Sequence, residues 1–214
     1  MNIHVLTFNP FQENTYIIYD EQTKAAAIID AGCMFEKEQQ QLENFIETNG
    51  LKVTYLLNTH LHLDHQFGNH FVASKYGVLP LASKEDEPLV NSLAEQVALF
   101  GLSRFKMESQ QLGGYLEDGQ ILSLCGTVCH VIATPGHSPG GLCFYFPEEK
   151  VLFSGDTLFA GGIGRTDVLR GDFRQLLKSI HQRLMVLPDD VVVYCGHGPH
   201  TTIGHERIHN LYLN

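Results

Sequence analysis

The chain has 214 residues, 43% hydrophobic and 18% charged, which is the composition of a globular protein able to bury a full core. Its 24 acidic residues outnumber its 14 basic ones, for a formal net charge of -10. This balance argues against a nucleic-acid partner, because phosphate backbones are bound by clustered lysine and arginine. The start "MNIHVLTFNP" lacks the features of a signal peptide, and no apolar run reaches the ~18 residues of a membrane span, so we expect a cytoplasmic protein that does not enter a membrane.

The first part of the chain alternates short apolar runs with amphipathic stretches. Residues 36–48 carry apolar side chains at helical spacing and predict a surface helix. Residues 64–76 predict another helix, and residues 83–107 predict one or two more with a break at Gly101. The expected strands of this part are 4–8, 14–20, 25–32 and 53–58.

The part after residue 110 repeats this organisation. The expected strands are 120–124, 127–136, 141–147, 150–156 and 190–198. Residues 172–184 predict a helix that Asp172 caps at its N-terminus. No linker divides the two parts, so we expect one domain over residues 1–214, an α/β protein with two stacked sheets and helices on the outside.

The five cysteines are odd in number and lie mostly in apolar runs. This predicts small, reduced core residues and not disulfides. They are Cys33, Cys125, Cys129, Cys143 and Cys195.

The stretch "THLHLDH" at residues 59–65 gathers costly polar groups directly after an apolar run. His60 and His62 would share one side of an extended backbone but lie about 200° apart around a helix, so we place them on a strand end or a loop. A helix starting near Asp64 would turn Asp64 and His65 back toward the same point.

A divalent metal would satisfy all four of these side chains together. One buried histidine is more often an ordinary core residue, but burying four such groups unpaired would cost roughly 1–3 kcal/mol each. Imidazole and carboxylate without an adjacent thiolate favour zinc, iron or manganese, and the sequence leaves that choice open.

Three later positions have the same character: His137 in "TPGHSPGG", Asp156 in "FSGDTLF" and His197 in "YCGHGPH". Each follows an expected strand and lies beside glycine, which lets backbone approach a ligand closely but also suits a bare turn. The repetition favours a site. Asp30 in "IIDAG" is a candidate supporting group.

The order H-x-H-x-D-H, then His, Asp and His, resembles the metallo-β-lactamase fold superfamily over nearly the whole chain. The resemblance implies an αββα sandwich of two mixed sheets with a two-metal site at one edge. It also implies that Asp30 supports the site without direct ligation. The implied ligands are His60, His62 and His137 for the first metal, Asp64, His65 and His197 for the second, and Asp156 as the bridge between them.

Other motifs are similar to those of short glyoxalase II-like (hydroxyacylglutathione hydrolase-like) proteins: "NTYII", "FSGDTLF", "GRTD" and "GHGPHTTIGHER". This resemblance implies hydrolysis of a small thioester such as S-2-hydroxyacylglutathione. Two-zinc β-lactamases match less well, because they typically have cysteine where this chain has Asp156 and carry a signal peptide. Nucleases of the superfamily are longer.

The implied mechanism is attack by a metal-bridging hydroxide, since two metals lower the pKa of a shared water toward about 7. A thiol of pKa about 8.5 then leaves without a strong general acid. We expect Asp64 to act catalytically by orienting the hydroxide. Arg165 in "GIGRTD" is the candidate for binding a substrate carboxylate, and the alternative is an ion pair with Asp167 or Asp172.

The substrate-binding walls are less determined. Longer glyoxalase II enzymes add a C-terminal helical domain, whereas only 17 residues follow His197, which puts glutathione specificity in question. Phe100, Phe105 and Met107 are candidates for a lid, with core packing as the alternative. Further candidates to line the pocket are Tyr145, His200 and His205.

Two other functions stay open at this point. A persulfide dioxygenase acting on glutathione persulfide resembles the same short group, and there one iron is held by the equivalents of His60, His137 and Asp156. The other is a non-enzymatic metal-binding module, although purely structural zinc needs only four ligands. The sequence does not specify the oligomeric state.

Overall fold

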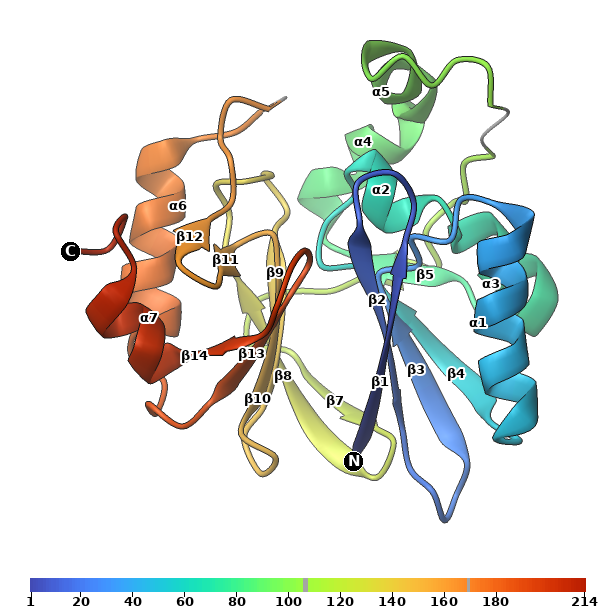
Figure 1. Ribbon diagram of the computed structural model, residues 1–214, viewed down its shortest axis with the longest axis horizontal. Helices are drawn as coiled ribbons and strands as arrows, with labels where there is room; N and C mark the ends of the chain where they lie inside the picture. The colour runs from blue at the N-terminus through green and yellow to red at the C-terminus, as the bar shows by residue number, and fades with distance from the viewer. Residues whose placement is uncertain (106–107, 169) are drawn as a thin grey trace.

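The computed structural model describes residues 1–105, 108–168 and 170–214. Two six-stranded sheets stack face to face with helices on both outer sides (Figure 1). The first sheet has the order β1 (Asn2–Phe8), β2 (Glu13–Tyr19), β3 (Ala25–Ile29), β4 (Lys52–Leu57), β5 (Pro80–Ala82) and β6 (Gly114–Tyr115). Its strands are antiparallel from β1 to β3 and parallel from β3 to β6.

The second sheet is formed by the later part of the chain. Its order is β14 (Thr201–Thr202), β13 (Val192–Cys195), β10 (Val151–Gly155), β9 (Leu142–Phe146), β8 (Thr127–Ala133) and β7 (Ile121–Leu124). Among the described strands of this sheet, only β10 and β13 pair in parallel. A small hairpin, β11 (Leu158–Phe159) and β12 (Gly162–Ile163), follows β10. The sheet division therefore follows the expected division of the chain near residue 110, except that β6 joins the first sheet from beyond it, and the αββα prediction is confirmed.

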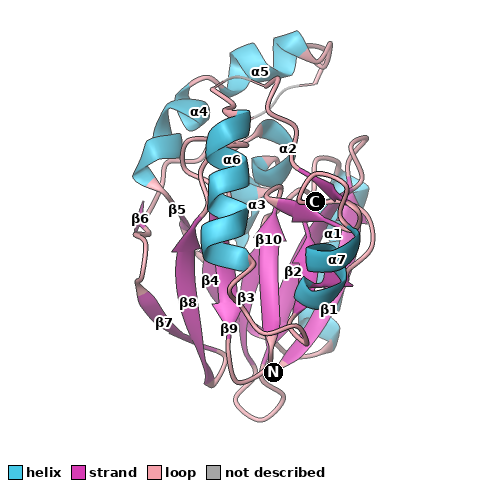
Figure 2. Cartoon of the chain, turned by 90° about the vertical axis from the view of Figure 1, so that its left-hand side faces the viewer, coloured by secondary structure: helices cyan, strands magenta, loops and turns pink. Residues whose placement is uncertain are grey.

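Helices cover the outer faces and one end of the sandwich (Figures 1 and 2). The first sheet is covered by α1 (Glu36–Thr48) and α3 (Asn69–Tyr76), and the second by α6 (Phe173–Ser179) with a π-helical continuation (Ile180–Leu184) and α7 (Ile203–His209). At one end lie α2 (Leu63–Gln66), the 3₁₀ turn η1 (Lys84–Asp86), α4 (Glu87–Asn91) and α5 (Leu93–Leu99). Within the described residues, no helix is long and apolar enough to cross a bilayer.

Strands buried on both faces explain the unbroken apolar runs. On β2, Ile17 packs toward the helical layer that contains Leu42 of α1, and the adjacent Ile18 packs between the sheets. On β10, Leu152 packs under α6, while Phe153 belongs to the core between the sheets. Each central strand thus contributes alternately to an outer and an inner core.

Some expected elements differ from the observed ones. The helix at 36–48 and the Asp172 cap of α6 are confirmed, the latter by a 3.0 Å hydrogen bond from the Gln175 N–H. The expected helix at 64–76 is divided at Gly68, where an added Cβ would overlap the sulfur of Cys33. The stretch 83–107 contains the turn η1 and two short helices, α4 and α5, the second of which ends at Leu99, two residues before the expected break at Gly101. Residues 106 and 107 lie outside the described part.

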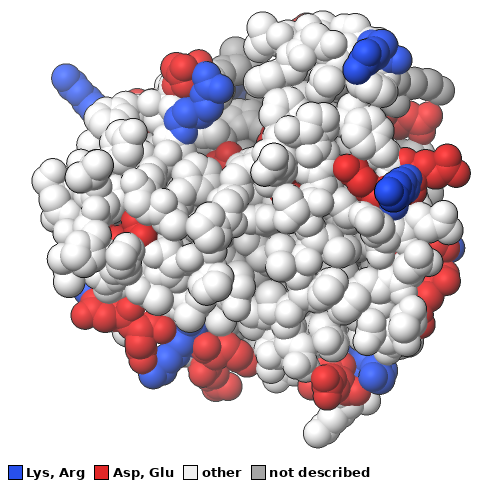
Figure 3. Space-filling model, viewed as in Figure 1, with Lys and Arg blue, Asp and Glu red and all other residues white. Residues whose placement is uncertain are grey.

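All five cysteines are buried and free, as expected. The short strands β5, β6, β11, β12 and β14 were not predicted, because two or three residues carry no readable periodicity. On the face drawn in Figure 3, the described Lys and Arg side chains are scattered, several beside acidic ones, and form no basic patch. The assignment of residues 1–214 to one domain stays a prediction.

Candidate metal centre and active-site pocket

The loop after β4 carries the first four candidate ligands. The strand ends at Leu57, and helix α2 begins at Leu63 with His62 in extended conformation at its N-cap. His60 and His62 therefore lie on the loop, while Asp64 and His65 lie in the first turn of α2. The helix starts one residue earlier than expected, and all four side chains are buried.

Three further candidates come from the second sheet. His137 lies in the loop after β8, Asp156 follows β10 directly, and His197 comes two residues after β13. Glycine permits this crowding. An added Cβ at Gly196 would overlap a carboxylate oxygen of Asp156 and lie 2.8 Å from a ring carbon of His65.

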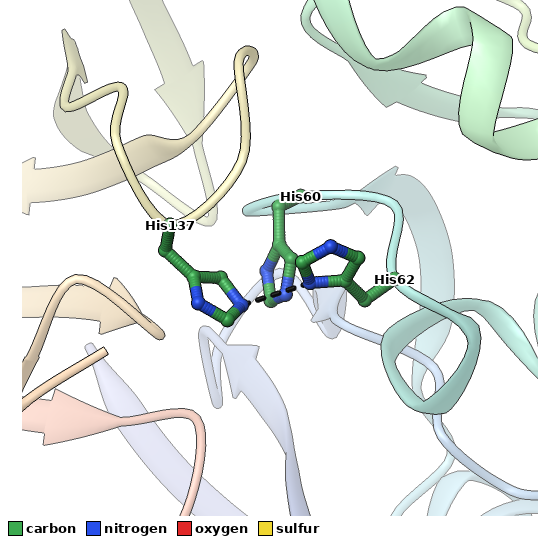
Figure 4. A group of neighbouring side chains, drawn as sticks. All are labelled: His60, His62 and His137. Carbon is green, nitrogen blue, oxygen red and sulfur yellow. Dashed lines mark hydrogen bonds between the residues drawn. The ribbon is translucent and has the colours of Figure 1, made fainter. Parts of the chain in front are cut away.

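The first cluster consists of His60, His62 and His137 (Figure 4), whose ring nitrogens lie within 4.8 Å of one another. The three rings point toward one another from two loops, and His62 Nδ1 lies 2.8 Å from His137 Nε2. His60 Nε2 and His62 Nε2 are buried and have no hydrogen-bond partner among the residues that the structure describes. Orphaned buried nitrogens are costly, so this cluster fits a bound metal ion.

The second cluster consists of Asp64, His65 and His197. His197 Nε2 lies 3.2 Å from Asp64 Oδ2 and 3.3 Å from His65 Nε2. Asp156 lies between the two clusters. Its Oδ1 is 3.4 Å from His65 Nε2, and its Oδ2 is 3.5 Å from His137 Nε2.

Backbone carbonyls set the tautomers of two of these histidines. A carbonyl oxygen only accepts, so His137 Nδ1 donates to Arg165 O at 2.7 Å and His197 Nδ1 donates to Phe11 O at 3.0 Å. The Nε2 atom of each ring is then left with its lone pair directed to the centre. This is the arrangement expected of histidine ligands to a metal.

Asp30 sets the orientation of two more rings, in keeping with its expected supporting role. It accepts hydrogen bonds from Thr59 N at 2.7 Å, from the Thr59 hydroxyl at 2.6 Å and from His65 Nδ1 at 3.0 Å. Because the Thr59 proton goes to Asp30, the Thr59 oxygen accepts from His60 Nδ1, 3.1 Å away. One buried carboxylate thereby directs Nε2 of both His60 and His65 inward.

The electrostatics differ between the clusters. Burial, and then the neighbouring His137, lower the pKa of His62 to about 3, so its imidazole is neutral and available as a ligand. Burial lowers the pKa of His65, but Asp156, Asp64 and Asp30 outweigh it and hold that pKa well above its usual value. Carboxylates that stabilise an imidazolium would also stabilise a metal cation.

A cavity of about 820 Å³ opens over both clusters. His62, Asp64, His137, Asp156 and His197 form its floor. Most of its walls are apolar side chains from α2, α5, the loop after β1 and the β11–β12 hairpin, including Phe11, Leu63, Leu99, Phe100, Phe159 and Ile163. Such a cavity suits a small organic substrate.

Arg165 lines this cavity but is already paired. Its guanidinium makes a bidentate ion pair with Asp167 at 2.8 and 2.9 Å, and both side chains are exposed. This is one of the two partners that the sequence left open; the other, Asp172, caps α6. Substrate binding by Arg165 therefore requires an exchange of partners.

The candidate lid residues divide between wall and core. Phe100 lines the cavity and contacts Phe11 with ring centroids 5.3 Å apart, whereas Phe105 packs on Phe35 in a hydrophobic cluster. Met107 lies outside the described residues. The described part of the cavity lining does not include Tyr145, His200 or His205, so those expectations were wrong.

Two buried carboxylates near the centre were not predicted. Glu13 of β2 is fully buried, and burial raises its pKa well above the usual value. A charged residue at the start of the apolar run "ENTYII" was its only signal. Asp86 lies in "SKEDEP", whose composition is that of a solvated turn, and local sequence carries no sign of its burial.

The fold and the two clusters define the class of the protein. The chain belongs to the metallo-beta-lactamase superfamily, whose family model matches residues 8–197. It is accordingly a metal-dependent hydrolase with a divalent metal centre formed by histidine and aspartate. The resemblance read from the motifs is confirmed.

Particular relatives narrow this class. Hydroxyacylglutathione hydrolase GloC of Haemophilus influenzae is 40% identical over 219 residues, which span 100% of this chain and 99% of that protein. The crystal structure of the BLEG-1 B3 metallo-beta-lactamase has a TM-score of 0.90 at 32% identity and covers 100% of both chains. That of TTHA1623 in a di-iron-bound form has a TM-score of 0.86 at 34% identity, covering 98% of this chain and 100% of that one.

Proposed function

We propose that the protein is a thioester hydrolase acting on small glutathione-derived substrates such as S-2-hydroxyacylglutathione. The observation that carries this proposal is the pair of ligand clusters joined by Asp156 beneath one cavity. A full second cluster favours a binuclear hydrolytic centre over a single-ion site. Likeness to GloC over the whole chain supports the substrate class.

The ligand assignment follows the two clusters. His60, His62 and His137 would hold one ion, Asp64, His65 and His197 the other, and Asp156 would contact both. We propose zinc as the bound metal, with iron and manganese as alternatives. Iron is kept as an alternative because the similar structure of TTHA1623 is a di-iron-bound form. When bound, the ions would lower the pKa of a water molecule toward about 7 and offer positive charge to a carbonyl oxygen.

Asp64 has a second role in this proposal. Burial raises its pKa, but the neighbouring His65 and His197 lower it below the usual value, so the side chain is an ionised acceptor. Since Asp64 lines the cavity floor, its carboxylate would accept a hydrogen bond from the attacking water and orient its lone pair toward the thioester carbon.

The remaining groups bind substrate and allow the leaving group to depart. The leaving thiol has a pKa of about 8.5, so it can depart as a thiolate without a proton from an acidic side chain. The apolar walls would hold the acyl group and exclude water, and Arg165 would turn from Asp167 to a substrate carboxylate. Arg165→Ala should therefore raise KM for a glutathione thioester several-fold and leave kcat largely unchanged; an unchanged KM would contradict this anchoring role.

The test combines metal analysis with a substrate panel. Purified protein is assayed for zinc, iron and manganese, and for turnover of a 2-hydroxyacylglutathione, its oxygen-ester analogue, a β-lactam and glutathione persulfide. We expect two metal equivalents and preferred cleavage of the thioester. Both should be lost in His60→Ala and kept in the control His205→Ala, whose side chain lies on α7.

Other outcomes favour the alternatives. One iron per chain with oxygen uptake on glutathione persulfide would overturn the hydrolase and support the persulfide dioxygenase. Preferred opening of the β-lactam would overturn the thioester proposal in favour of a β-lactamase, the class in which BLEG-1 is named. Metal binding without turnover of any of the four compounds would support a binding module.

A further inference from the structure

Asp86 is a fully buried carboxylate that lies outside both ligand clusters. It ends the 3₁₀ turn η1 and stands at the N-cap of α4, in the short helical segment at one end of the sandwich (Figure 2). The mechanism above makes no use of it. A buried aspartate needs partners, because isolated buried charge is strongly unfavourable.

Its hydrogen bonds reach both loops that carry the first cluster. Asp86 Oδ2 accepts from Leu61 N at 3.2 Å and from the Ser138 hydroxyl at 2.8 Å. Asp86 Oδ1 accepts from Gly140 N at 2.6 Å. Leu61 lies between His60 and His62, and Ser138 directly follows His137. The Asp86 side chain therefore joins the two loops, whose facing residues His62 and His137 are 75 residues apart in the sequence.

Packing around these bonds is close on both sides. A Cβ added at Gly140 would lie 2.7 Å from Cγ of Asp86, so glycine is what allows the second loop to reach the carboxylate. On the other side, the buried Leu61 side chain packs against Leu89 and Val90 of α4. The segment from η1 to α4 thus contacts the first loop through both polar and apolar groups.

We propose that Asp86 is a positioning residue that sets the distance between the His60–His62 loop and the His137 loop, and thereby the geometry of the first metal site. This inference rests on the proposed metal centre. His62 Nδ1 and His137 Nε2 face each other at 2.8 Å, and the two loops that carry them are both hydrogen-bonded to Asp86. A shift of either loop would separate these two ring nitrogens.

Replacement by asparagine releases one loop whichever way the amide is oriented. If the amide nitrogen takes the place of Oδ1, it faces the Gly140 N–H, and two donors oppose each other. If it takes the place of Oδ2, the Leu61 N–H loses its acceptor. Asp86→Asn should therefore weaken zinc binding about 10-fold or more, the range typical of groups that orient ligands.

A matched control distinguishes positioning from general stability. Glu206 is also fully buried and accepts three hydrogen bonds, from Gly161 N, the Thr201 hydroxyl and the Asn210 amide, none of them from the two loops. Glu206→Gln should lower the melting temperature comparably and leave zinc affinity within about twofold of the wild type. Ser138→Ala, a milder change, should weaken zinc binding by a few-fold.

The experiment uses the full chain stripped of metal. Zinc affinity is measured by competition with a chromophoric chelator, and the visible spectrum of the cobalt(II)-loaded protein reports ligand geometry. We expect weaker zinc binding and an altered cobalt spectrum in Asp86→Asn and Ser138→Ala, but not in Glu206→Gln. Wild-type zinc affinity and cobalt spectrum in Asp86→Asn would overturn the positioning role of Asp86 but not the proposed function. An equal loss of zinc affinity in Glu206→Gln would do the same. Failure of the wild-type protein to bind zinc would overturn the proposed function, and this role with it.

Discussion

Asp30→Asn is the most informative single change at the centre, because the backbone tolerates it. Asp30 has φ of 53°, in the left-handed region that asparagine adopts more readily than other non-glycine residues. The substitution keeps the volume and shape of the side chain but replaces one acceptor oxygen with a donor. Its effect therefore reports hydrogen bonding and charge, with little backbone strain.

Each orientation of the new amide has a defined consequence. With nitrogen in place of Oδ1, the Thr59 N–H is left without an acceptor. With nitrogen in place of Oδ2, the Thr59 hydroxyl and His65 Nδ1 become acceptors. The Thr59 proton then turns to His60 Nδ1, and both His60 and His65 carry their proton on Nε2, the atom needed by a metal.

The magnitude follows from these contacts. One unsatisfied buried group should lower the unfolding free energy of the metal-free protein by about 1–3 kcal/mol. Misdirected histidine tautomers should weaken zinc binding about 10- to 100-fold, which corresponds to about 1.4–2.8 kcal/mol. Chelator competition and thermal unfolding measure the two quantities separately.

A remote carboxylate provides the control. Asp118 accepts from Ala133 N at 2.8 Å and pairs with Arg183, away from the centre. Asp118→Asn should leave zinc affinity unchanged. The reasoning is refuted if folded Asp30→Asn binds zinc with wild-type affinity and melts at the wild-type temperature.

Three further predictions concern the same centre. Asp64→Asn should reduce kcat about 100-fold or more with a smaller change in KM, and a variant that keeps both metals and nearly full kcat would contradict the orienting role. Gly196→Ala should abolish metal loading, because its Cβ would overlap Asp156, whereas Gly50→Ala, with no atom within 4 Å of the added Cβ, should affect only stability. Zinc affinity should rise with pH up to the raised pKa of His65, because the metal must displace that proton. Calorimetry in two buffers of different ionisation enthalpy would show the proton release, and a pH-independent affinity would contradict it.

Much of the architecture could be predicted because its causes are local. The helix at 36–48 is set by apolar spacing within one segment, and the long strands are set by continuous apolar runs. Helix α5 ends at Leu99, close to the expected break at Gly101, but the lack of helix over residues 102–105 was not predictable in this way, because Leu102 and Phe105 continue the apolar pattern and yet pack without helical backbone. In this segment, packing of Phe105 against Phe35 outweighs the helical propensity of the sequence.

The sequence by itself determined which residues are available as ligands, because the seven candidate histidines and aspartates can be identified from their residue type and their position after apolar runs. Only the tertiary structure decided how they group and what orients them. His62 faces His137, Asp30 directs two rings, Arg165 is held by Asp167, and Asp86 ties two loops together. Except for the Arg165 pair, these contacts join residues far apart along the chain. Their geometry arises when strands align within a sheet and the two sheets stack, which no local pattern encodes.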